Sequence, residues 1–217
     1  MRLTTYIKLL ALVATAALTG CATTTPYDYT ALRDAKPASI LVMPPLNHSP
    51  EVTAPAGVLS QATLPIAEAG YYVLPVAVTD EMFRENGIVS AEDAQDIPAA
   101  KLREIFGADA ALYLDIKSYC TSYAVVTSAT VVTLEAKLID LRTGKQLWDG
   151  KATASSAEGQ NSGGGLVGML VTALVNQVVN TLSDRSVQIS GITTQRLLSP
   201  NMQRGLLPGP RSVNYGK

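Results

Sequence analysis

The sequence contains few residues that could catalyse a reaction or hold a metal. His48 is its only histidine, so a Ser-His-Asp site would have to use it. It follows Pro44-Pro45 in a predicted loop at the end of a strand, where loops can carry function. A solvent-exposed loop histidine is the simpler interpretation, and a catalytic histidine is the alternative. With one histidine and two cysteines, the composition does not favour a transition-metal site, and we expect no cofactor.

Two further clusters resemble functional motifs but lack their spacing. Glu92, Asp93 and Asp96 have neither the glycine nor the terminal glutamate of a calcium loop, so we interpret them as charges at a helix N-terminus. The run from Gly163 to Gly165 lacks the Lys-Ser/Thr of a phosphate loop, which indicates a flexible linker. The sequence therefore predicts no active site, and we expect a protein that is not an enzyme.

Cys21 has the clearest chemistry in the chain. Residues 1–20 read as a signal peptide, with Arg2 and Lys8 before an apolar run that is too short to span a bilayer. The motif Leu18-Thr19-Gly20-Cys21 follows directly and is typical of the bacterial lipobox, in which the peptide is cleaved before the cysteine and its thiol is acylated. An ordinary signal peptide that happens to carry a cysteine is the alternative.

Acylation of Cys21 would hold the protein on a membrane, because each buried methylene contributes about 0.8 kcal/mol and several chains act together. The next residue is Ala22 rather than aspartate. By similarity to Gram-negative lipoproteins, this implies sorting to the outer membrane, with the domain facing the periplasm or the cell surface.

The composition limits the partners. Seventeen basic and eighteen acidic residues give a net charge of −1, without the basic excess of a nucleic-acid-binding protein. With Cys21 acylated, Cys120 has no partner for an intramolecular disulfide. Since Cys120 falls in phase with Leu112, Leu114 and Ile116 on one strand, we predict a buried, free thiol that packs as a small hydrophobe. A reactive or intermolecular thiol is the alternative.

Hydrophobic periodicity predicts an α/β (α+β) fold, a mixed β-sheet with helices packed on it and a closing antiparallel meander. The predicted strands cover residues 39–43, 71–76, 110–120, 128–140 and 146–151. The predicted helices cover residues 56–69, a short segment from Thr79 or Asp80 through Phe83, and residues 96–106. Pro65 predicts a kink or break in the first helix, and the run from Arg142 to Lys145 predicts a hairpin turn.

The predicted domain covers residues 38–198, between a polar tether of residues 21–37 and an extended Pro/Gly-rich arm of residues 199–217. Residues 166–182 carry no charge. We predict that they form a helix on the sheet or in a subunit interface, and a membrane-seeking helix is the alternative. Because the apolar side of such a helix needs cover, we expect a dimer or larger assembly.

Four stretches together resemble a family of bacterial lipoproteins of unknown function that includes a meningococcal surface vaccine antigen. They are ILVMPPLNHSPEV (residues 40–52), LPIAEAGYYVLPVAVTDEMFRENG (64–87), LREIFGADAALYLDIK (102–117) and LIDLRTGKQLWDG (138–150). The resemblance implies a fold like the N-terminal domain of TolB and the periplasmic domain of CsgG, a homodimer, and a gene beside that of a CsgG-like lipoprotein. It implies no catalytic or binding residue, and His48 stands where the family pattern has a glutamate.

Two classes of function remain. The favoured one is an outer-membrane-anchored interaction or assembly module in envelope transport or secretion, with a CsgG-like partner. The alternatives are an enzyme that acts on envelope polymers through His48 or the acidic cluster, and a CsgG-like pore subunit. For the pore, the outward alternation of Glu135 and Lys137 favours a soluble sheet over a lipid-facing one.

Overall fold

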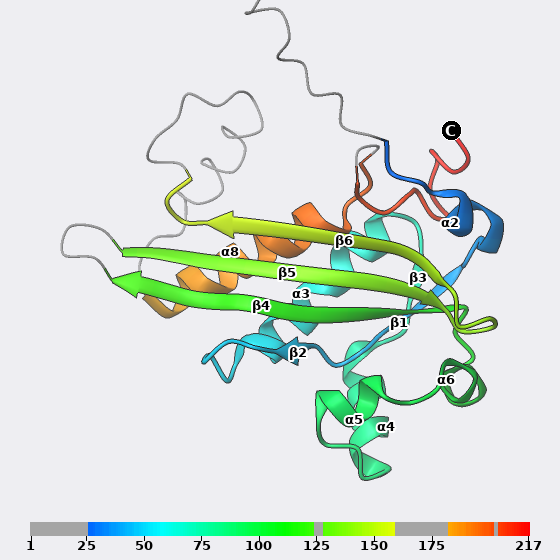
Figure 1. Ribbon diagram of the computed structural model, residues 1–217, viewed down its shortest axis with the longest axis horizontal. Coiled ribbons are helices and arrows are strands. Elements are labelled where there is room, and N and C mark those ends of the chain that lie inside the picture. The colour runs from blue at the N-terminus through cyan, green and yellow to red at the C-terminus, as the bar shows by residue number, and fades with distance from the viewer. Residues whose placement is uncertain (1–25, 124–127, 159–181, 202–203) are drawn as a thin grey trace, which may run out of the picture.

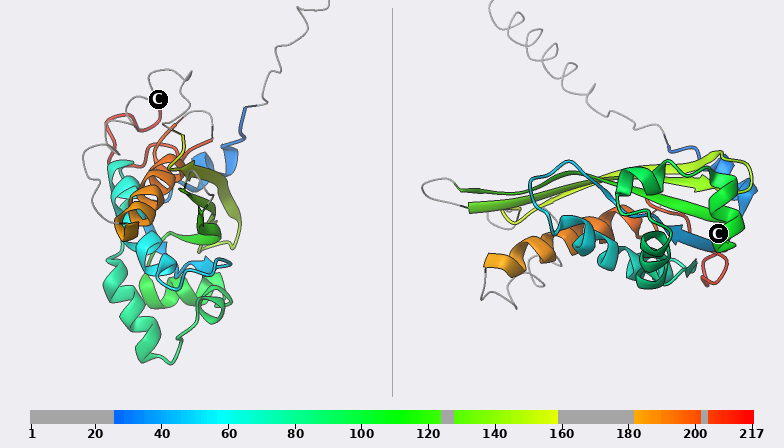
Figure 2. Two further views of the ribbon diagram at one scale, coloured as in Figure 1. Left: turned by 90° about the vertical axis from the view of Figure 1, so that its left-hand side faces the viewer. Right: turned by 90° about the horizontal axis from the view of Figure 1, so that it is seen from below.

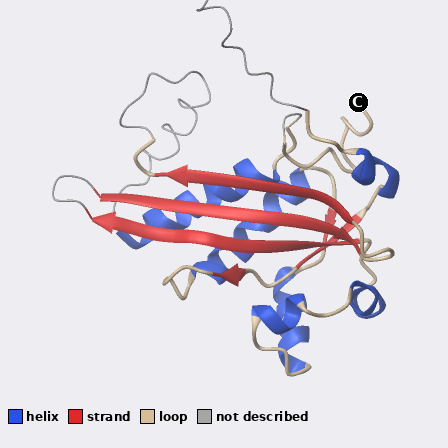
Figure 3. Ribbon diagram, viewed as in Figure 1, coloured by secondary structure: helices blue, strands red, loops and turns tan. Residues whose placement is uncertain are grey.

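A computed structural model describes residues 26–123, 128–158, 182–201 and 204–217. Helices and short strands make up the first half of the chain, and three long strands precede the last helix (Figure 3). In chain order the elements are α2 (Thr30–Ala35), β1 (Ser39–Val42), β2 (Leu46–Asn47), α3 (Ala54–Glu68), β3 (Tyr72–Val73), α4 (Val76–Glu85), α5 (Ala91–Gln95), α6 (Ala99–Phe106), β4 (Ala110–Tyr123), β5 (Ser128–Asp140), β6 (Gln146–Ser155) and α8 (Leu182–Leu198).

The strands form one mixed sheet in the order β3-β1-β4-β5-β6, and β2 pairs with β4 beside β1 (Figure 1). The pairs β1–β3, β1–β4 and β2–β4 are parallel, whereas β4, β5 and β6 form an antiparallel meander. This arrangement confirms the predicted mixed α/β sheet. Sequence periodicity did not predict β2, because two residues are too short to show an alternating pattern.

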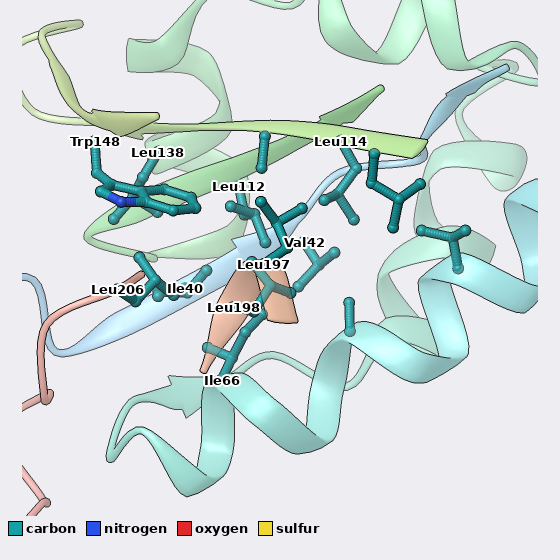
Figure 4. Packing of buried hydrophobic residues seen from close by; sticks show 14 of the residues in the cluster. Ile40, Val42, Ile66, Leu112, Leu114, Leu138, Trp148, Leu197, Leu198 and Leu206 are labelled. Carbon is teal, nitrogen blue, oxygen red and sulfur yellow. The ribbon is translucent and has the colours of Figure 1, made fainter. Parts of the chain in front are cut away.

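The main core lies between the sheet and α3 and α8, which run along the same side of the long strands (Figure 2). Leu112 and Leu114 of β4 and Leu138 of β5 alternate with more solvent-exposed residues and are fully buried in this core (Figure 4). Burying one leucine side chain stabilises a fold by about 1.5–3 kcal/mol. Val132 and Leu134 of β5 are buried in the same cluster, so the apolar face of this strand is covered within the domain.

A smaller core occupies the opposite face at the β1 end of the sheet. Leu41 and Met43 pack there against Phe83 of α4 and Leu102 of α6. These short helices cover only that end, so the outer face of β4, β5 and β6 lies open in the foreground of Figure 1. The open face carries half-buried or exposed polar side chains, which alternate with the buried residues along each strand.

Local sequence signals account for some helix boundaries and not for others. α6 ends at Gly107, which adopts the left-handed conformation (φ 66°) common at helix C-termini. α3 runs without a break through Pro65, contrary to the break that we considered. Val76, not Thr79 or Asp80, begins α4, and Thr79 is buried inside the helix, with its hydroxyl donating to the carbonyl of Val76.

Cys120 is exposed, so the prediction of a buried thiol was wrong. The pairing of β4 with β5 shifts between Ile116 and Ser118, where a β-bulge adds one residue to β4. A one-residue insertion moves every later side chain to the opposite face. Tyr119 is therefore buried at 4% exposure, whereas Cys120 lies on the open face with its Sγ 3.5 Å from the Ser118 hydroxyl.

Both ends of the described chain pack on the domain. Tyr29 and Leu32, which we expected in a polar tether, are buried in the main core. Leu206, which we expected in an extended arm, is fully buried beside Ile40 and Trp148 (Figure 4). Local composition indicated a Pro/Gly-rich arm but did not show that one leucine within it fills the core.

Three aromatic side chains hold the C-terminal segment, residues 204–217, through its carbonyl groups. Trp148 Nε1 donates to Arg204 O at 3.0 Å, Tyr29 Oη to Gly205 O at 2.6 Å, and Tyr71 Oη to Leu207 O at 2.8 Å. Each bond satisfies a donor that would otherwise be buried without a partner. The segment is thus a structural part of the domain.

Several predictions concern residues outside the described ranges. The signal peptide of residues 1–20, Cys21, the glycine run at 163–165 and the uncharged segment 166–181 belong to this group. Leu182, the last residue of the helix predicted at 166–182, begins α8, and our sequence interpretation had not assigned the rest of this helix, residues 183–198, to an element. Within the described ranges, no helix is long and apolar enough to cross a membrane.

Candidate functional site

His48 lies beside the bulged part of β4. The parallel pairing of β2 with β4 brings it there, and its backbone N–H donates to Ile116 O at 3.0 Å. Its Nε2 is 3.2 Å from Asp115 Oδ1. The His48 side chain is 56% exposed, which agrees with the expected loop position at the end of a strand. The contact with Asp115 depends on β2 and was not predicted.

Asp115 begins a chain of opposite charges across the open face. Lys117 Nζ bonds to Asp115 Oδ2 and lies 3.7 Å from Glu135 Oε2, and Lys151 Nζ bonds to Glu135 Oε1 at 2.9 Å. The hydrogen bond to Asp115 raises the pKa of Lys117, and the hydrogen bond from Lys151 lowers the pKa of Glu135. Both groups are exposed to solvent, so these pairs add little stability.

His48 and Asp115 form a pair that could accept a proton, but no described nucleophile joins them. The Ser49 hydroxyl donates to Asn47 Oδ1 at 2.7 Å, and Cys120 Sγ lies beside Ser118. Nor does the part of the chain that the structure describes bring three or more histidine, cysteine or acidic side chains together in a way that could hold a metal. The geometry therefore gives no support to the envelope-polymer enzyme that we considered for His48.

The acidic cluster has a structural role at α5. Ser90 is the N-cap residue of this helix, and its hydroxyl accepts the N–H of Asp93 at 3.0 Å. Glu92 and Asp93 lie in the first turn, where the helix dipole favours negative charge. Asp96 caps the other end of α5. The interpretation as charges at a helix N-terminus is thus correct for Glu92 and Asp93 and wrong for Asp96, which lies at the C-terminus of α5.

A surface groove of about 410 Å³ lies between the β1–β2 loop, α3, α4 and α5, and we call it the valine groove. Two apolar side chains at its border are almost fully exposed, Val52 at 87% and Val89 at 83%. Its remaining lining consists of Pro44, Pro45, Asn47, Pro55, Ala56, Leu59, Asp80, Arg84, Ala91 and Glu92.

The walls of the valine groove are held in place by hydrogen bonds. Gln95 Nε2 donates to Pro44 O at 2.8 Å and to Leu114 O at 3.2 Å, which joins α5 to the proline loop and to β4. Arg84 and Asp80 pair with each other at 2.8 Å along α4. Arg84 and Asp80 thereby neutralise each other, so that Glu92 and the two exposed valines are left to contact another molecule. Sequence analysis missed this groove, since its residues come from four separate elements.

Comparisons with known proteins agree with one another. The family model described as "Putative lipoprotein GNA1162-like" matches residues 27–211. The "Putative lipoprotein NMB1124/NMB1162" of Neisseria meningitidis serogroup B is 47% identical over 208 residues, which cover 94% of this chain and 96% of that protein. The crystal structure of lipoprotein GNA1162 from Neisseria meningitidis is 48% identical, covers 67% of this chain and 100% of its own, and superposes with a TM-score of 0.55.

Proposed function

The chain belongs to the GNA1162-like family of lipoproteins, and we propose that it acts in the bacterial envelope as a lipid-anchored, non-catalytic docking module. In this proposal the acylated Cys21 holds the protein on the outer membrane, and the domain faces the periplasm or the cell surface. Its partner is a CsgG-like lipoprotein in envelope transport or secretion. The lipobox at residues 18–21 supports the anchor, and the valine groove supports the docking role.

The exposed valines carry the docking proposal. A large, almost fully exposed apolar side chain is unremarkable when it stands alone, but apolar side chains that border one concave surface are typical of contact sites. Val52 and Val89 border the same groove. Because Gln95 fixes α5 against the proline loop and β4, a partner would meet a preformed surface and lose less conformational entropy on binding.

The anchor can be tested in cells by the substitution Cys21→Ser. The expected result is a precursor that is neither cleaved nor labelled with palmitate and that no longer fractionates with the outer membrane. If the variant is still cleaved and still fractionates with that membrane, the anchor proposal is wrong.

The docking surface can be tested with a photoreactive amino acid placed at position 52 or 89 of the lipidated protein in intact cells. Both positions should yield the same crosslinked partner. Val213 serves as a matched control, because it is 86% exposed but lies outside the groove. A crosslinked partner identical at all three positions, or none at 52 and 89, would contradict docking in the groove. Mass spectrometry of the crosslinked band would then decide whether the partner resembles CsgG.

A second copy of the chain is a further proposed partner. The uncharged composition of residues 166–182 supports it, since the helix predicted there would need apolar cover. Light scattering of the unlipidated mature protein should show a dimer or larger species, which Val171→Glu or Val178→Glu should dissociate. A wild-type monomer at high micromolar concentration would exclude the dimer.

A further inference from the structure

A second cavity, of about 350 Å³, lies between α2, Tyr71 and the C-terminal segment. Its apolar wall includes Leu32, Tyr71, Leu207 and Pro208. Burial raises the pKa of Tyr71, so that its hydroxyl stays neutral and donates to Leu207 O. This volume is at the lower end of the range of small-ligand sites and suits part of an amphiphilic molecule better than a whole lipid.

Three basic side chains line the cavity, and no acidic side chain does. They are Arg33, Lys36 and Lys217. Within the described residues none of the three forms an ion pair, whereas Arg84, Lys101, Arg142, Lys151 and Arg196 each pair with a carboxylate. A cavity with an apolar wall and several unpaired cations complements a ligand that has an apolar part and a negative charge.

Lys36 adopts an unusual backbone conformation for its residue type. It is the C-cap of α2 with a φ of 48°, and among the described residues it is the only non-glycine residue with positive φ. Glycine is the common residue at such a position, because a Cβ atom makes the left-handed conformation unfavourable. Holding a lysine in this conformation costs backbone energy. A cost of this kind points to a functional role for the lysine side chain.

The sequence places this cavity close to the proposed anchor. Cys21 lies five residues before Pro26, where the described chain begins, so the lipid-bearing residue is at most about 18 Å from the domain. The first described residues lead directly into α2, and the C-terminus lies beside it (Figure 1). The side of the domain that carries Arg33 and Lys36 is therefore the side that the tether holds near the lipid head groups.

We infer that this cavity binds the head of an anionic phospholipid from the membrane in which Cys21 is anchored. The lipid phosphate would lie among Arg33, Lys36 and Lys217, with its glycerol and first methylene groups against Leu207 and Pro208. This inference rests on the proposed lipid anchor. One acyl anchor leaves a domain free to rotate, and a second attachment through basic residues fixes its orientation.

Vesicle binding of the unlipidated protein tests the cavity separately from the anchor. The mature chain with Cys21→Ser is mixed with vesicles of phosphatidylcholine, with or without phosphatidylglycerol. Binding is expected only to vesicles that contain phosphatidylglycerol. The triple variant Arg33→Gln, Lys36→Gln, Lys217→Gln should bind about 100-fold more weakly, since each basic residue near an anionic surface contributes roughly a factor of five.

The control variant removes the same charge elsewhere, by Lys101→Gln, Lys137→Gln and Lys151→Gln on α6 and the open sheet face. It should bind like the unsubstituted chain. If both triple variants weaken binding equally, net charge alone explains the attraction and the cavity is not a lipid site. An absence of binding to phosphatidylglycerol would also overturn the inference, while the anchor would still stand or fall on the fractionation of the Cys21→Ser protein in cells.

Thermal denaturation of the unsubstituted chain gives a readout that does not depend on any of these charge variants folding. Soluble dihexanoyl phosphatidylglycerol should raise the melting temperature, because a ligand that binds only the native state stabilises it. Dihexanoyl phosphatidylcholine should raise it less, and inorganic phosphate should leave it unchanged. An equal increase in melting temperature with inorganic phosphate would show a site for free phosphate. No increase with dihexanoyl phosphatidylglycerol would show that the lipid does not bind. Either result refutes the proposal.

Discussion

Replacing Leu206 by alanine should destabilise the whole domain, although this leucine lies in the last part of the chain. Leu206 is fully buried in the main core with Ile40 and Trp148. A Leu→Ala substitution in a core costs about 2–5 kcal/mol, and the cost is higher where the surroundings cannot collapse into the space. Three aromatic donors hold the carbonyls around Leu206 in place. We therefore expect a loss of about 3–4 kcal/mol in the free energy of unfolding.

Urea denaturation followed by tryptophan fluorescence would measure this loss. Trp148 is the only tryptophan, is fully buried, and bonds to Arg204 in the segment under test. Val213→Ala is the matched control, because Val213 is 86% exposed in the same segment and its loss should change stability by less than about 0.5 kcal/mol. A loss below about 1 kcal/mol for Leu206→Ala would refute the integral role of this segment, since core truncations cost at least about 2 kcal/mol.

Three other predictions follow from single contacts. Because Cys120 is exposed, a thiol reagent should label it as fast in the native Cys21→Ser chain as in urea, and native protection would contradict the bulge in β4. Burial acts to raise the pKa of Asp109, but hydrogen bonds from the Ala38 and Ser39 N–H groups and the Ser39 hydroxyl outweigh it and lower this pKa. The stabilisation that these hydrogen bonds give to the folded state is present above the usual pKa of 3.8. It is lost as the pH falls through the lower pKa of Asp109 in the folded state. Asp109→Asn should therefore cost roughly 1.5–3 kcal/mol at neutral pH and less in acid, and a pH-independent cost in urea titrations would contradict this. Gly150→Ala would place a methyl group in the Trp148 ring, so unfolding should become easier by about 1–3 kcal/mol, and unchanged stability in a thermal melt would refute that packing.

Sequence periodicity predicted the elements whose pattern repeats over many residues. β4, β5 and β6 have ten or more residues each, and all three were predicted, although β6 continues from the predicted end at Lys151 to Ser155. It failed at Cys120, because a bulge inserts a single residue and the local sequence reads equally well in either phase. It also failed for Tyr29 and Leu206, whose burial depends on contacts with distant parts of the chain. Composition describes what such segments resemble and gives no information about where they pack.

The candidate sites, too, were only partly predictable from the sequence. The exposed His48 was predicted, but its contact with Asp115 depends on a two-residue strand that pairs with a partner far along the chain. The valine groove, and the cavity between α2, Tyr71 and the C-terminal segment, are each lined by residues from several separate segments. The left-handed conformation of Lys36 is the one local feature that marks the cavity, and it is seen in the backbone angle and not in the sequence.

The attachment of the N-terminal segment determines how the domain would respond to a pulling force on the lipid proposed at Cys21. Tension from Cys21 would enter at Tyr27, whose hydroxyl donates to Asp149 Oδ1 at 3.0 Å, and then at Tyr29. Next in line is α2, which has six residues and is not a strand of the sheet. Unwinding α2 would lengthen the tether by about 11 Å, the difference between helical and extended rise. Since α2 lies between this segment and β1, its unwinding would take up part of the extension before the pull reaches the pairing of β1 with β3 and β4.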